Sequence, residues 1–174
     1  MAIVEFLIPH FHRLHESQEQ AIHDLTSEEF HFLPNEHANH IAFTIWHCVR
    51  TEDNVIRFVF QNRRPTIWIQ NRWDEKFGLD RIAQGTAMSR NDAVGVRFGS
   101  VQDFSAYMHE VWESTEEYLE RLKDDDLQEL VVIKPRGEFT LGDALQEVVL
   151  THQFSHLGEI WALRGLQGLK GAPS

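Results

Sequence analysis

Two histidines near the C-terminus, His152 and His156, lie four residues apart inside an apolar segment. Side chains at positions i and i+4 lie one above the other on an α-helix, so two imidazoles at this spacing can converge on one metal ion. At about 100° per residue, His152, His156 and Glu159 fall in the middle of the apolar stripe of this helix. Because a buried imidazole or carboxylate without a partner is costly, we expect these side chains to be satisfied by a ligand or a neighbouring helix.

Two familiar metal motifs do not fit this segment. Zinc proteases carry H-E-x-x-H, whereas Gln153 stands where that motif has its glutamate. A ferritin-like di-iron site needs two E-x-x-H motifs on paired helices, and the one match, Glu28 to His31, falls in a short turn.

A catalytic zinc-type site needs three protein ligands and an open position, so the chain must supply another ligand. Spacing alone leaves His47, Glu52 and His109 as competing candidates. His47 lies on the shoulder of its helix, which places a site that includes it at the mouth of the bundle or requires a helix bend. Glu52 lies closest to the centre of the apolar face. We expect Asp53 to be solvated, and also most of the histidines of the first helix: His10, His12, His15 and His23.

Four long stretches with helical periodicity must position these residues. They cover about 3–24, 39–62, 100–123 and a last stretch that begins at Thr140 and stops at Gly165 and Gly168. Helix-start signals occur at Thr26 with Glu29, at Ser100 and at Thr140. Asn39 is the expected N-cap of the second helix. The apolar side of the first helix is expected to include Phe6 and Phe11.

The composition of the segments between these helices also predicts their structure. The connection 63–99 contains Trp68, Trp73 and Phe77, and so much aromatic content predicts that it packs over the bundle. Residues 129–140 are expected to be extended or to form a hairpin. The sequence therefore predicts an all-α four-helix bundle with a long connection between the second and third helices, as a single domain over 1–174.

The composition excludes several classes of partner. The chain has 16 Lys and Arg against 27 Asp and Glu, a net charge of −11, which disfavours nucleic acid and anionic membrane surfaces. The single cysteine, Cys48, suits a reducing compartment and is interpreted as packing. The N-terminal segment is a poor signal peptide and no apolar run approaches the ~20 residues of a membrane span, so we expect a cytoplasmic protein.

The segment "NHIAFTIWHCVRTEDNVIRFVF", followed near the C-terminus by "THQFSHLGEIWALRGL", resembles the DinB/YfiT-like superfamily. The resemblance implies an up-down-down-up four-helix bundle that binds one divalent metal, with His47, His152 and His156 as ligands. It also implies homodimers and, in some members, thiol-dependent S-transferase or isomerase activity.

A site of three neutral imidazoles would leave the charge of a Zn, Ni or Fe ion uncompensated, and so would favour bound hydroxide or thiolate. We therefore expect an enzyme that acts on a small molecule, as a low-molecular-weight thiol S-transferase or a hydrolase. Glu159 would orient a ligand or act as a base. The alternatives are a non-catalytic, dimeric metal-binding stress protein and a plain bundle whose histidines are hydrogen-bonded within the core.

Overall fold

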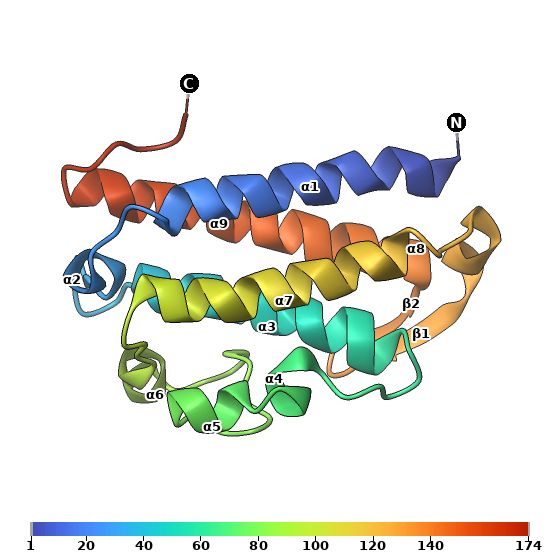
Figure 1. Ribbon diagram of the computed structural model, residues 1–174, viewed down its shortest axis with the longest axis horizontal. Coiled ribbons are helices and arrows are strands. Elements are labelled where there is room, and N and C mark those ends of the chain that lie inside the picture. Colours follow the sequence, from blue (N-terminus) through green and yellow to red (C-terminus); the bar gives the residue numbers. More distant parts are fainter. Residues whose placement is uncertain (1, 174) are drawn as a thin grey trace.

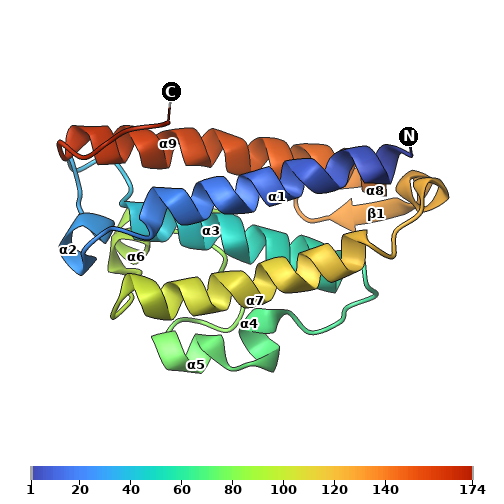
Figure 2. The same cartoon turned by 45° about the horizontal axis from the view of Figure 1, so that its top comes forward.

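Four long helical segments run side by side along the longest axis of the computed structural model, which describes residues 2–173 (Figure 1). They are α1 (Ile3–Ile22); α3 (Ile41–Asp53) with its π-helical continuation η1 (Asn54–Val59); α7 (Val101–Leu119); and α8 (Leu141–Asp143), η3 (Ala144–Thr151, π-helical) and α9 (His152–Leu166), which form one continuous rod. α1 and α9 run in one direction and α3 and α7 in the other, which confirms the up-down-down-up bundle (Figures 1 and 2).

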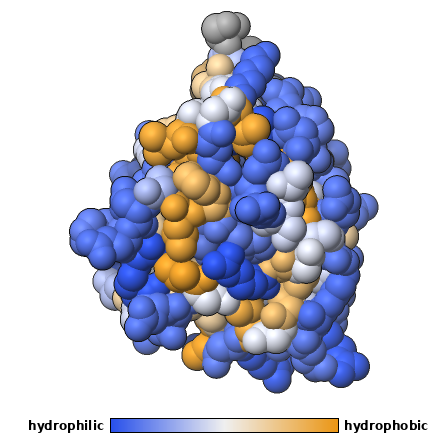
Figure 3. Space-filling view, turned by 90° about the vertical axis from the view of Figure 1, so that its left-hand side faces the viewer, coloured by the Kyte–Doolittle hydropathy of each residue, from blue (hydrophilic) through white to orange (hydrophobic). Residues whose placement is uncertain are grey.

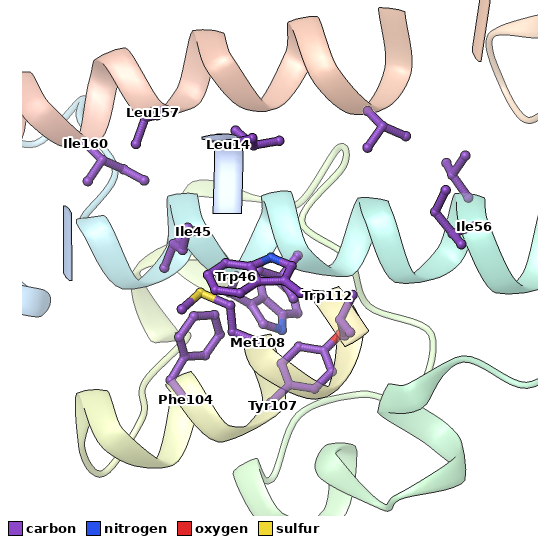
Figure 4. Packing of buried hydrophobic residues seen from close by; sticks show 14 of the residues in the cluster. Leu14, Ile45, Trp46, Ile56, Phe104, Tyr107, Met108, Trp112, Leu157 and Ile160 are labelled. Atoms are coloured by element: carbon purple, nitrogen blue, oxygen red, sulfur yellow. The ribbon is translucent and has the colours of Figure 1, made fainter. Parts of the chain in front are cut away.

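Helices α1 and α3 each pack against both α7 and α9, which closes the bundle. The apolar stripes expected for α3, α7 and the last helix supply most of the core, including Ile45, Met108 and Ile160, which are fully buried. Figure 4 shows Trp46 of α3 pointing toward Phe104 and Met108 of α7. The prediction for Phe6 was wrong, because this side chain is 56% exposed. Val4 is the buried residue of that turn, and a residue two positions on lies about 200° away around the helix.

The helix-start signals mostly hold in the structure. Thr26 and Glu29 form a capping box for α2 (Ser27–Phe30). Ser100 Oγ accepts from the backbone N–H of Asp103 at 3.0 Å, and Thr140 Oγ1 accepts from that of Asp143 at 3.1 Å. The expected cap Asn39 was wrong, since α3 starts later.

His40 caps α3 instead. Its Nδ1 accepts from the backbone N–H of Phe43 at 2.9 Å. Burial lowers the pKa of His40 to about 4, so the ring is neutral and able to accept at neutral pH.

The long connection packs over the bundle, as predicted. It contains α4 (Ile67–Gln70), α5 (Trp73–Phe77) and α6 (Arg90–Gly95), and Trp68 is fully buried with its ring 5.2 Å from that of Tyr107. Asp53 anchors it, because its carboxylate accepts from the backbone N–H groups of Ile67 and Trp68 at 2.8 and 3.0 Å. The expectation that Asp53 is solvated was therefore wrong. These two backbone groups lie 14 and 15 residues further along the chain, and only tertiary structure brings them to Asp53.

Residues 129–140 form the expected hairpin. Strands β1 (Leu130–Ile133) and β2 (Gly137–Thr140) pair antiparallel, with Leu130 opposite Thr140 and Ile133 opposite Gly137. The 3₁₀ helix η2 (Asp124–Gln128) leads into the hairpin. β1 lies against η1, so the turn of the hairpin reaches the part of the bundle that carries the histidines.

The surface is predominantly hydrophilic at the end of the bundle that carries the C-terminus, with only narrow apolar strips (Figure 3). Within residues 2–173, no helix combines the length and apolarity needed to cross a membrane.

Candidate metal centre

The histidine site lies where two π-helical segments interrupt the rods that carry it. η3 ends at Thr151, directly before His152, and η1 starts seven residues after His47. A π-helical turn holds an extra residue, so it rotates every later side chain relative to an ideal α-helix. π-Helical turns of this kind occur often at functional sites.

This rotation corrects the expected phase of the last helix. His152, His156 and Glu159 were predicted in the middle of the apolar stripe, yet both histidines are half-buried and the Glu159 side chain is 59% exposed. Gln153 is the fully buried polar residue of this turn. The histidines therefore lie at the edge of the core, and the shoulder position of His47 matches them, which puts the site at the mouth of the bundle.

Three imidazoles from two helices converge at this edge. His47, His152 and His156 each offer a nitrogen, and these nitrogens lie within 4.8 Å of one another, a group that could hold a metal ion. The ring planes are nearly perpendicular, with centroids 4.6 to 5.3 Å apart. The Nε2 atoms of His47 and His152 are 3.1 Å apart. Ligand nitrogens around an ion at ~2.0–2.1 Å lie roughly 3 to 3.4 Å from their neighbours, so this pair fits, and small ring rotations would complete the set.

The loop 84–87 orients His47. Its Nδ1–H donates to the backbone carbonyl of Gln84 at 2.5 Å, which leaves the Nε2 lone pair directed at the cluster. The next residue, Gly85, has φ +88°, and a Cβ there would lie 2.8 Å from His47 Nδ1. Only glycine allows the loop this close, so Gly85 is required for the orientation of His47.

A carboxylate orients His156. Glu159 accepts from His156 Nδ1–H at 2.8 Å, which again leaves Nε2 with its lone pair. The expectation that Glu159 orients a ligand is consistent with this contact. Nδ1 of His152 is buried and has no hydrogen-bond partner within residues 2–173, so packing and the contact between its Nε2 and that of His47 hold this ring.

The site favours neutral imidazoles. Burial lowers the pKa of His47, and it lowers that of His152 to about 3, with further contributions from His47, His156 and Arg136. Both rings are therefore deprotonated at neutral pH, which is the form that binds a metal.

A pocket of about 530 Å³ opens onto these histidines. Its walls come from α3, η1, the loop 84–87, the hairpin turn and η3. Phe43 lies in the wall with its ring parallel to that of His47, 6.3 Å away. The pocket is large enough for a small organic molecule beside the cluster.

The family model of the DinB superfamily matches residues 10–160. This chain belongs to the DinB superfamily. No curated protein matches it. Among solved structures, a conserved protein from Enterococcus faecalis superposes with a TM-score of 0.82 at 22% identity, over 95% of this chain and 97% of the other. At that identity the likeness shows a shared fold.

Two other candidates for the third position lie elsewhere in this DinB-superfamily bundle. His109 is on the surface, where its Nε2 is 2.9 Å from a carboxylate oxygen of Glu19. Glu52 is fully buried and accepts from Thr115 at 2.6 Å and from Gln153 at 2.7 Å. Neither belongs to the histidine cluster.

Glu52 instead centres a buried polar network that the sequence did not reveal. His15, expected to be exposed, is 4% exposed and lies 3.1 Å from Glu52 and 3.2 Å from Glu116. Burial lowers the pKa of His15, but the two carboxylates together raise it to about 9. Burial raises the pKa of Glu52, but the charge of His15 and the hydrogen bonds from His15, Thr115 and Gln153 together lower it. The network thus holds a buried imidazolium–carboxylate pair next to Gln153, which directly follows His152.

Proposed function

We propose that this protein is a metal-dependent enzyme that acts on a small molecule, with His47, His152 and His156 as ligands of one divalent transition metal. The observation that carries the proposal is the convergence of three imidazoles beside a 530 Å³ pocket, two of them with a lone pair fixed by a partner at Nδ1. An all-imidazole set suits Zn or Ni, and also Fe.

The residues around the three histidines have separate roles in this proposal. The Gln84 carbonyl and Glu159 hold two rings with Nε2 facing inward. A bound divalent ion would supply Lewis acidity that lowers the pKa of water or of a low-molecular-weight thiol. Glu159 is engaged at His156 Nδ1 and does not line the pocket, so in this proposal it orients the ring, and a proton released by the activated group passes to solvent. Burial raises the pKa of the Cys48 thiol, which argues against this residue as the nucleophile.

Metal content tests the ligand assignment. We expect purified protein to hold close to one equivalent of metal, and His156→Ala to lose most of it, because two imidazoles remain. His109→Ala is the matched control, since it removes a surface histidine with a carboxylate partner. Content below about 0.3 equivalents in the wild type, or unchanged content in His156→Ala with a cooperative melt, would refute the assignment.

The reaction needs a separate assay. Conjugation of a thiol to a chlorinated or epoxide electrophile identifies an S-transferase, and release of acid from an ester or amide identifies a hydrolase. We expect one of these activities to disappear after chelation and to return with metal. Loaded protein that is inactive in both assays would argue against an enzyme.

A non-catalytic, dimeric metal-binding protein is the second candidate. Ile3, Phe6 and Phe154 are exposed and line one surface pocket between α1 and the last helical rod. Such an exposed apolar patch favours an interface with a second copy. Light scattering on wild type and Phe6→Asp tests it, and a wild-type monomer would exclude it.

A further inference from the structure

The charges around the pocket differ from those of the rest of the chain. Acidic residues outnumber basic ones by 27 to 16, yet none of the described side chains that line the pocket is a carboxylate. Two lining residues are cationic, Lys134 and Arg136, both from the turn of the hairpin. Glu159, an acidic neighbour of the cluster, is engaged with His156 and lies outside the lining.

These two cations are available to a ligand. Within residues 2–173, neither Lys134 nor Arg136 has a side-chain hydrogen bond or an ion pair, and both are exposed. Both line the same pocket as His152 and His156. The positive edge of the pocket is therefore continuous with the histidines.

Side chains from α3 and η1 also line the pocket. Asn54 offers an amide, whereas the Oγ1 of Thr51 is buried and not open to the pocket. Ile133 and Val148 add apolar wall between these polar groups.

We propose that this pocket binds a small molecule with an oxyanion group, a carboxylate or phosphate, which Lys134 and Arg136 hold while another group of the same molecule reaches the histidines. A guanidinium matches an oxyanion with paired N–H donors, and a lysine adds a point charge. Asn54 can hydrogen-bond the body of the molecule. This inference rests on the proposed function and names the class of molecule that the site would take.

Two small thiols test the proposal on the Co²⁺-loaded protein. Mercaptosuccinate carries two carboxylates, and 1-thioglycerol is uncharged apart from its thiol. Each binds through sulfur with loss of the thiol proton to buffer, and the thiolate-to-cobalt absorption band reports occupancy. We expect the wild type to prefer mercaptosuccinate, and Lys134→Gln/Arg136→Gln to lose about tenfold of that affinity with its 1-thioglycerol affinity unchanged.

The control variant is Arg13→Gln/Lys123→Gln, which changes the net charge equally at exposed positions that do not line the pocket. It should keep the preference. A wild type that does not distinguish the thiols, or an equal loss in the control, would overturn the proposal, because the effect would then come from net charge.

The metal proposal can fail separately. Absence of the cobalt band in every variant would count against the three-histidine site. Binding of succinate to chelated protein, followed by saturation-transfer NMR, then tests the two cations alone. Weaker binding by Lys134→Gln/Arg136→Gln than by the control would support the oxyanion site, and equal binding would overturn it.

Discussion

At the scale of single residues, the site depends on a glycine that sequence spacing does not mark. Gly85 brings the Gln84 carbonyl to His47, and a methyl group there would collide with the ring. We expect Gly85→Ala to push the loop away, to leave His47 free to rotate, and to weaken metal affinity by about 10- to 100-fold, as loss of a ligand's hydrogen-bond partner commonly does. Competition with a chelating indicator measures this affinity.

Gly158→Ala is the matched control. Gly158 lies within the motif that carries the family resemblance, yet a Cβ there meets nothing within 4 Å. Metal affinity should not change, and the free energy of unfolding should rise by up to ~1 kcal/mol, because alanine is the better helix former. Equal losses of affinity in both variants would contradict the role given to Gly85.

At the scale of elements, helix-cap motifs predicted the helix starts more reliably than helical periodicity predicted which side of the last helix is buried. The caps at Thr26, Ser100 and Thr140 depend on residues three positions away, so the sequence contains everything that forms them. The phase of the last helix depends on the π-helical segment η3, which packing against other helices selects and which no local pattern announces. The pairing of the histidines was predictable from i,i+4 spacing, whereas their depth in the core was not.

The sequence did not predict the buried pair of His15 on α1 and Glu52 on α3, for a related reason. The spacing of His15 from Phe11 fits the buried side of α1, but its side chain is polar, and its burial depends on Glu52 and Glu116 from other helices. Its pKa is raised to about 9 in the folded state, above about 6.5 in the unfolded chain. The pair therefore stabilises the fold fully below pH 6.5, and this contribution is lost as the pH rises toward 9.

We expect the free energy of unfolding to fall by on the order of 3 kcal/mol between pH 6.5 and 9 in the wild type because of His15. In His15→Gln, which keeps a donor for Glu52, that dependence should be much flatter. Urea unfolding at several pH values measures both. His109→Gln, which alters an exposed histidine, should retain the wild-type slope. Parallel slopes in wild type and His15→Gln would show that the ring is not charged in the fold.

At the scale of the whole molecule, the three histidines join segments about 105 residues apart, α3 and the last helical rod. An ion bound there would link these helices in the folded state only, since the unfolded chain cannot preserve the cluster. Metal at 100 times its dissociation constant adds ~2.7 kcal/mol to the free energy of unfolding, which raises the Tm of a chain of this size by roughly 5–10 °C. Calorimetry with and without Zn²⁺ should show this rise in the wild type. His156→Ala should show little or none. A similar rise in both proteins would place the stabilising ion at a different site and would contradict a three-histidine centre as the link between α3 and α9.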